Sequence, residues 1–335
     1  MTNPILVEVT RGTTVESIHR GAACVVDLDG KVVDSWGDVD ALTCPRSALK
    51  PMQALPLIET GAAARFVLTD EELALACASH NGEPEHVRRV EAWLARAGFS
   101  VRDLECGAHV PMHAPAAEAL MRAGGRPCPI HNNCSGKHTG FLCLAVHLNA
   151  PTKGYTEPAH AVQREAFAAI GTMADVEPKA LPIVRDGCSA PNLFMPLKNL
   201  ALAWARMGQP AKLAKARAAA ARRIVDAMKT HGFLFSGTDR PCLALTQSLA
   251  GRGVAKVGAE GIYAACEPER GLGIAVKIDD GAARAASVAL AAILNRLGAF
   301  KPAAGDAVAK LLSVPHKAWA GAETGVVRVA DGWLT

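Results

Sequence analysis

Short apolar runs separated by turn residues occur near both ends of the chain, whereas the middle carries apolar residues at helical spacing. The runs near the N-terminus predict three strands, at residues 5–10, 22–28 and 32–36. Asp29 and Gly30 lie between the last two runs and favour a hairpin turn. The runs near the C-terminus predict three more strands, at residues 254–257, 261–266 and 271–278.

The middle of the chain is predicted to be mostly helical. Thr69 and Glu72 have the spacing of a capping box, which indicates the start of a helix. Apolar periodicity and capping signals predict helices at residues 73–78, 84–98, 114–123, 136–149, 158–171, 196–207 and 211–230. A last helix is predicted at residues 283–297.

This order of elements predicts an α/β fold of the α+β kind. Strands from both chain ends are joined by short turns, so we expect one mainly antiparallel sheet flanked by helices. We expect the sheet to be built from about residues 1–45 and 250–300, and a helical lobe from about 46–250. No repeat or linker interrupts the sequence, so residues 1–335 are interpreted as one catalytic unit.

Composition excludes several classes of function. The net charge is +4 and aromatic residues make up 4%, without the basic patch or stacking aromatics of nucleic-acid-binding proteins. We find neither a signal-peptide pattern nor an apolar run long enough to span a membrane. The ten cysteines show no C-x-x-C spacing, which is typical of reduced thiols in the cytoplasm. We therefore expect a cytoplasmic protein that binds neither nucleic acid nor membrane.

Three short motifs that can support nucleophilic catalysis follow one another along the chain. They are S-x-x-K at Ser47 and Lys50, S-x-N at Ser79 and Asn81, and K-x-G beginning at Lys256. This ordered set occurs in penicillin-binding proteins and class A β-lactamases. In a helix, Ser47 and Lys50 share one face, and Pro51 is tolerated if the helix begins near Ser47. A lysine that loses its proton can then activate a serine hydroxyl.

Two polar, glycine-containing segments place a cysteine beside hydrogen-bonding groups. Residues 131–138 contain Cys134, and residues 185–191 contain Cys188. Two thiolates suit zinc, with the remaining ligands drawn from Lys137, His138, Asp186 or water. Because C-x-x-C spacing is absent, spacing alone favours two buried thiols over a metal site.

Four sequence blocks resemble the rhizobial-type, or class 3, L-asparaginases of the asparaginase II family. The blocks are R-S-A-L-K-P at residues 46–51, C-A-S-H-N-G-E at 77–83, N-N-C-S-G-K-H at 132–138 and D-G-C-S-A-P at 186–191. The resemblance covers nearly the whole chain. It implies a fold similar to serine β-lactamases and glutaminases, and hydrolysis of L-asparagine to L-aspartate and ammonia.

The resemblance also implies roles for individual residues. Two Ser–Lys tandems carry over by motif, one formed by Ser47 with Lys50 and one by Ser79 with Lys256. The family's zinc site maps onto Cys134, Lys137 and Cys188, where the metal supports substrate binding rather than the chemistry. Candidates for substrate binding are Arg46, His80, Asn81, Glu83, His138 and Asp186. Family members are homodimers, so we expect a homodimer here.

Two questions about mechanism stay open at this point. Ser47 is the favoured nucleophile, with Lys50 as its base and an acyl-enzyme intermediate, but Ser79 is the alternative. The same motifs also fit a β-lactamase or peptidase, a zinc-dependent hydrolase in which Ser47 is a bystander, or a binding protein on an inherited scaffold. Selectivity between asparagine and glutamine depends on the shape of a pocket that the sequence does not reveal.

Overall fold

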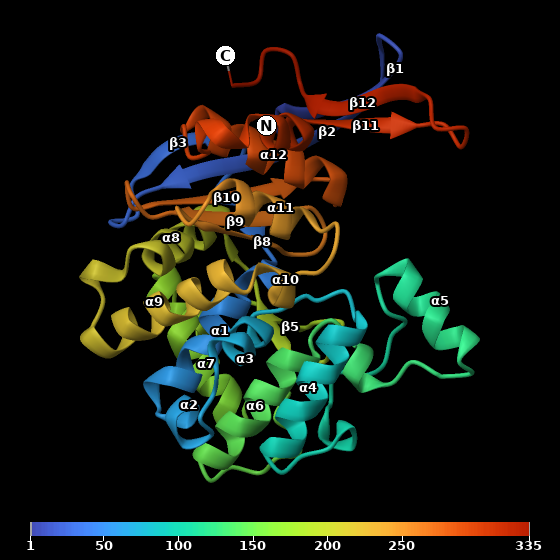
Figure 1. Cartoon of the computed structure of the whole chain (residues 1–335). Helices are drawn as coiled ribbons and strands as arrows, with labels where there is room; N and C mark the ends of the chain where they lie inside the picture. The colour runs from blue at the N-terminus through green and yellow to red at the C-terminus, as the bar shows by residue number, and fades with distance from the viewer. Residues whose placement is uncertain (1, 335) are drawn as a thin grey trace. The chain divides into compact units, whose positions relative to one another are not determined.

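The computed structural model describes residues 2–334 (Figure 1). The chain divides into two compact units, each made of segments that are distant in sequence. The sheet unit comprises residues 2–48, 195–209 and 244–334 of the described part. The helical unit comprises residues 49–194 and 210–243.

An antiparallel sheet organises the sheet unit. Its strands follow the order β11-β12-β1-β2-β10-β9-β8, with β3 also paired to β2. Every pairing described in this sheet is antiparallel, which confirms the predicted fold class. The strands are β1 (Ile5–Arg11), β2 (Thr14–Val26), β3 (Val32–Trp36), β8 (Val254–Val257), β9 (Ile262–Glu267), β10 (Leu272–Ile278), β11 (Ser313–Lys317) and β12 (Glu323–Val329).

Helices pack on this sheet, and Figure 1 shows α8 and α12 on opposite sides of β9 and β10. The helices of this unit are α8 (Leu197–Gly208), α12 (Ala283–Arg296) and α13 (Gly305–Leu312). Helix α8 approaches β10 closely at Gly273, where an added Cβ would lie 1.9 Å from the Ala201 carbonyl oxygen. A residue with a side chain therefore does not fit at this crossing. The short strands β4 (Leu42–Thr43) and β7 (Met195–Pro196) also pair in this unit.

The helical unit is built around α1. This helix packs against α3, α6, α7 and α9, and eight of its ten residues, Lys50 to Leu57, are buried. The helices are α1 (Lys50–Glu59), α2 (Ala62–Arg65), α3 (Asp70–Ala76), α4 (Pro84–Arg96), α5 (Ala114–Arg122), α6 (Ser135–His147), α7 (Ala161–Ala174), α9 (Lys215–Thr230) and α10 (Gly232–Phe235). Strands β5 (Ile183–Arg185) and β6 (Pro191–Leu193) form a hairpin, and α11 (Pro241–Ser248) spans the last boundary between the units.

Most predicted elements are present within a few residues of their predicted bounds. The capping box at Thr69 and Glu72 is formed, and it starts α3. Three differences stand out. Strand β2 begins earlier than predicted, at Thr14, because its first half pairs with β1. The strands β11 and β12 were not predicted. Helix α8 packs on the sheet, although residues 46–250 were assigned to the helical lobe.

Candidate active site

Ser47 lies in a 3₁₀ turn, η1 (Arg46–Leu49), that leads directly into α1. Pro51 occupies one of the first two positions of α1, where its missing N–H costs no intrahelical hydrogen bond. Arg46 adopts a left-handed conformation with φ of 52°, an uncommon conformation for a residue with a side chain. Within the sheet unit, the Ala48 carbonyl accepts a hydrogen bond from the Trp204 indole nitrogen over 3.1 Å. This bond to α8 fixes the segment that carries Ser47.

Lys50 and Ser79 are in contact inside the helical unit. The Lys50 Nζ donates to Ser79 Oγ over 2.9 Å and also to the Ala78 carbonyl. Both side chains are buried, with exposed fractions of 1% and 3%. Ser79 follows α3, and its N–H donates to the Phe235 carbonyl over 3.0 Å. The lysine of the first motif therefore contacts the serine of the second, an arrangement that the spacing within either motif does not reveal.

Lys256 is buried on β8, and its Nζ donates to the Val257 carbonyl over 3.0 Å. The glycine of the same motif, Gly258, packs on the segment before Ser47. A Cβ added at Gly258 would lie 2.5 Å from the Pro45 carbonyl oxygen. Within the sheet unit, the end of β8 therefore lies beside residues 45–48.

The polar side chains after Ser79 are bound to other protein groups. His80 Nδ1 accepts from the Gly82 N–H over 3.0 Å, and its Nε2 lies 2.9 Å from Ser135 Oγ. Burial lowers the pKa of His80 well below its usual value, and His86 and Lys50 act in the same direction. The His80 ring is therefore neutral, and its two nitrogens hold the loop together.

Asn81 and Glu83 are joined to the segment that follows α10. The Asn81 amide donates to Glu83 Oε1 and to the Thr238 carbonyl, at 3.2 and 2.9 Å. Glu83 accepts from the Thr238 N–H over 2.8 Å and from its hydroxyl over 2.7 Å. Although burial opposes the charged form, these hydrogen bonds lower the pKa of Glu83. Both residues were predicted to bind substrate, and that role stays a prediction.

Cys134, Lys137 and Cys188 come together in the helical unit. Cys134 and Lys137 lie at the start of α6, and Cys188 lies in the turn between β5 and β6. Lys137 Nζ donates to Cys188 Sγ over 3.0 Å. A hydrogen bond from Cys134 lowers the pKa of Cys188 well below its usual value, and Lys137 acts in the same direction. The two loops that the sequence analysis singled out thus form one cluster of two sulfurs and an amine.

His138 and Asp186 flank this cluster. His138 is fully buried, and its Nδ1 lies 2.9 Å from the Tyr155 hydroxyl. The His138 Nε2 atom has no hydrogen-bond partner of good geometry among residues 2–334. Burial lowers the pKa of His138, and the nearby Cys188 sulfur opposes this effect. Asp186 accepts from the Gly187 N–H over 2.6 Å and helps to shape the turn that carries Cys188.

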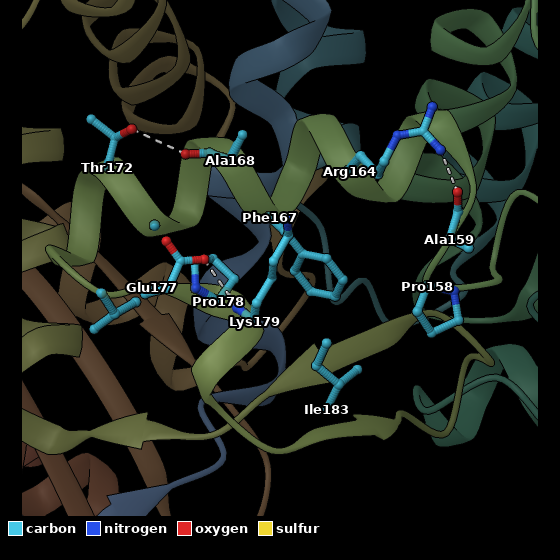
Figure 2. A pocket seen from close by; sticks show the side chains of 12 residues that line it. Pro158, Ala159, Arg164, Phe167, Ala168, Thr172, Glu177, Pro178, Lys179 and Ile183 are labelled. Carbon is cyan, nitrogen blue, oxygen red and sulfur yellow. Dashed lines mark hydrogen bonds between the residues drawn. The ribbon is translucent and has the colours of Figure 1, made fainter.

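A sizeable cavity lies away from the predicted site residues. It has a volume of about 580 Å³ and is bounded by α7, the segment after it and the start of β5 (Figure 2). Phe167 on α7 and Ile183 on β5 line it. None of the thirteen candidate site residues from the sequence analysis is among its lining residues.

The segment from Phe235 to Arg240 contacts Ser79, Asn81 and Glu83, but it was not among the predicted site residues. The run Ser236-Gly237-Thr238-Asp239-Arg240 is polar and contains glycine, so the criterion used for the two cysteine loops would have found it. Over residues 2–334, no helix is long and apolar enough to cross a membrane. No group of three or more His, Cys, Asp or Glu side chains in those residues is arranged to hold a metal. The cluster at Cys134 and Cys188 is not such a group, since its third member is a lysine.

Several solved structures are similar to this chain. A structure of Mglu in its native form is 16% identical with a TM-score of 0.47, and the match covers 83% of this chain and 65% of that chain. A β-lactamase from Mycobacterium bovis is 18% identical with a TM-score of 0.39, over 82% of this chain and 94% of that chain. A putative β-lactamase from Bacteroides dorei is 13% identical with a TM-score of 0.41, and the match covers 82% of this chain and 93% of that chain. The chain thus spans slightly less than two thirds of the Mglu structure.

Sequence comparison gives the family directly. A search of curated proteins found no match. The family model described as L-asparaginase II, however, matches residues 7–329, which is nearly the whole chain and includes all four sequence blocks. The chain therefore belongs to the L-asparaginase II family of amidohydrolases.

Proposed function

We propose that this protein hydrolyses L-asparagine to L-aspartate and ammonia by Ser–Lys nucleophilic catalysis. The observation that carries the proposal is the hydrogen bond of 2.9 Å between Lys50 Nζ and Ser79 Oγ, two almost fully buried groups. Burying a lysine is costly because the ammonium group loses its water, so a buried lysine that contacts a serine is a candidate for a functional pair. Lys50 also follows Ser47 by three residues, at the start of a helix.

In the proposed mechanism, Ser47 attacks the side-chain carboxamide carbon and Lys50 accepts its proton. Lys50 then supplies a proton, through the Ser79 hydroxyl, to the leaving nitrogen. Ammonia departs, and water hydrolyses the acyl-enzyme. Lys256, the lysine of the second tandem, is proposed to relay protons or to polarise the amide. Backbone N–H groups near Ser47 would stabilise the oxyanion.

Lys50 also supports the alternative in which Ser79 is acylated, because it contacts that hydroxyl directly. A diazoketone analogue of asparagine, which alkylates the nucleophile, separates the two assignments. After labelling, peptide mass spectrometry places the adduct on Ser47 if the favoured assignment is correct. An adduct on Ser79 reverses the roles of the two serines.

We also propose a zinc site formed by Cys134, Lys137 and Cys188. The donor set fits zinc because Cys134 and Lys137 are each hydrogen-bonded to Cys188, and His138 Nε2 lies buried beside them. Cys188 and Cys134 raise the pKa of Lys137 although burial opposes its charged form, so zinc binding would release a proton from this amine. Bound zinc would supply an electropositive anchor for substrate, while His138 and Asp186 orient the ligands.

Two further proposals concern the state of the protein in the cell. A homodimer is proposed from the family resemblance alone. A cytoplasmic location is proposed because all ten cysteines are free thiols, as a reducing compartment would keep them. Light scattering of the purified protein and localisation of a tagged chain test these two proposals.

The first test of function is ammonia release from L-asparagine and L-glutamine, with and without zinc. Release from asparagine supports the proposal, and a zinc effect confined to KM supports a binding role for the metal. Hydrolysis of nitrocefin without ammonia release would favour a β-lactamase-like activity instead. Loss of kcat on zinc removal, with full activity in Ser47→Ala, would favour a zinc-dependent hydrolase.

A further inference from the structure

The segment from Phe235 to Arg240 lies directly against the Ser79 motif within the helical unit. The Phe235 carbonyl accepts from the Ser79 N–H, and Thr238 donates twice to Glu83. Gly237 has φ of 126° and packs so closely on Asn81 that an added Cβ would lie 2.6 Å from the amide carbon. This segment therefore forms one wall around the residues that follow Ser79.

Two polar groups in this wall have no partner. The Ser236 hydroxyl is buried in a residue that is 1% exposed, and it forms no hydrogen bond. The Arg240 Nε is also buried without a partner, and its guanidinium forms no ion pair with the described residues 2–334. The Arg240 N–H donates to the Gly237 carbonyl over 3.4 Å, so the chain turns between the two side chains. Buried polar groups are nearly always paired, so these two groups are available to bind a ligand.

The neighbouring polar groups are already engaged. His80 uses both ring nitrogens, and the Asn81 amide and the Glu83 carboxylate are bound to each other and to Thr238. Glu83 would moreover repel a carboxylate. Ser236 and Arg240 are therefore the uncommitted donors on this side of Ser79.

A guanidinium and a hydroxyl are donors that match a carboxylate, because the fork of N–H groups binds two oxygens at once. Resting on the proposed function, we propose that Ser236 and Arg240 bind the α-carboxylate of L-asparagine and of the product L-aspartate. This pair then fixes the end of the substrate that does not react. It would also select α-amino acids over simple amides, since an amide without a carboxylate leaves the cation unpaired.

The experiment compares wild type with Arg240→Gln and Ser236→Ala. Isothermal titration with L-aspartate is expected to show about 10–100-fold weaker binding for Arg240→Gln, because hydrogen bonds to charged groups are worth about 1.5–3 kcal/mol. KM for L-asparagine should rise by a similar factor, while kcat changes less than about fivefold, as expected when binding is lost equally in ground and transition states. Inhibition by β-alaninamide, which lacks the α-carboxylate, should not change.

Arg222→Gln, on the exposed face of α9, is the matched control and should bind L-aspartate like wild type. Arg240→Lys keeps the charge and should recover part of the affinity if Arg240→Gln folds poorly. Wild-type affinity for L-aspartate in both Arg240→Gln and Ser236→Ala, or no measurable binding in wild type, would overturn the inference. A wild-type protein that binds L-aspartate through these residues but releases no ammonia from L-asparagine would instead refute the proposed function.

Discussion

Lys50 on the first turn of α1 donates to the hydroxyl of Ser79, 29 residues later in the chain, over 2.9 Å. The same amine also binds the Ala78 carbonyl, so two contacts fix its position. Replacing Lys50 by Met keeps the length of the side chain but removes the proton acceptor. We expect kcat for L-asparagine to fall by about 10²–10⁴-fold, the usual contribution of a general base. Steady-state ammonia release measures this effect.

Lys215→Met is the matched control for Lys50→Met, because Lys215 is exposed at the start of α9. It should retain the wild-type rate. Circular dichroism and thermal unfolding should show that Lys50→Met is folded, since methionine fills a similar volume in the core. A folded Lys50→Met protein with a wild-type rate would refute the Ser–Lys mechanism.

The cysteine cluster predicts a loss of zinc on substitution of Cys188. Cys188→Ser replaces a thiol that hydrogen bonds to Cys134 and Lys137 by a poorer zinc ligand. We expect zinc affinity to fall by at least about 100-fold, because loss of an outer-shell partner alone costs 10–100-fold in metal affinity. Competition with a chelating dye measures the affinity, and mass spectrometry of dialysed protein measures the zinc content.

Cys128→Ser serves as the control for Cys188→Ser. Cys128 lies outside the cluster, and its sulfur is 3.4 Å from His131 Nδ1, a contact that serine can also make. This variant should keep the zinc content of wild type. Equal zinc binding by the Cys188→Ser and wild-type proteins would remove Cys188 from the proposed site.

Local sequence signals were sufficient for much of the fold. The capping box at Thr69 and the Asp29-Gly30 turn depend on neighbouring residues, so they can be read from the chain alone. Strand β11 was missed because Pro315 interrupts its pattern, and proline is tolerated there at the edge of the sheet. Strand β12 was missed as well, although it contains three valines.

The sequence predicted the residues of the candidate site, but it did not predict most of the contacts between them. Motif spacing identified Lys50 and Ser79, but only the packing of α1 near α3 brings one against the other. Ser236 and Arg240 stand out because Ser236 Oγ and Arg240 Nε are buried without a hydrogen-bond partner in the described residues. No sequence pattern predicts such a missing partner. The pairing of Cys134 with Cys188 likewise depends on how the β5–β6 hairpin folds onto α6.

Buried histidines predict that the protein becomes less stable in mild acid. Burial lowers the pKa of both His80 and His86 below the usual 6.5. Between the folded pKa and 6.5, the unfolded chain binds more protons than the folded chain, so the free energy of unfolding decreases as pH falls. Glu83 adds to this effect at lower pH, because its lowered pKa makes its contribution present above pH 4.5 and lost in stronger acid. Urea unfolding at a series of pH values measures the slope.

His86→Gln isolates one of these histidines. His86 Nδ1 accepts from the Glu83 N–H at the start of α4, and a glutamine at this position can accept the same bond. Because glutamine does not titrate, the variant should lose less stability than wild type when the pH falls below about 6.5. Parallel slopes for His86→Gln and wild type would show that His86 does not titrate in this range.

The last prediction concerns Gly258, which separates β8 from the segment before Ser47. Gly258→Ala would bring a methyl group to 2.5 Å from the Pro45 carbonyl oxygen and 2.7 Å from Ile262, both closer than atoms tolerate. Since backbone must shift to relieve the contact, we expect a loss of about 1–3 kcal/mol in the free energy of unfolding. We also expect kcat to fall more than KM rises, because the displaced residues carry the proposed nucleophile. Gly305→Ala, where an added Cβ meets nothing within 4 Å, should change neither quantity. Normal kcat in Gly258→Ala would show that the position of residues 45–48 beside β8 does not matter for catalysis.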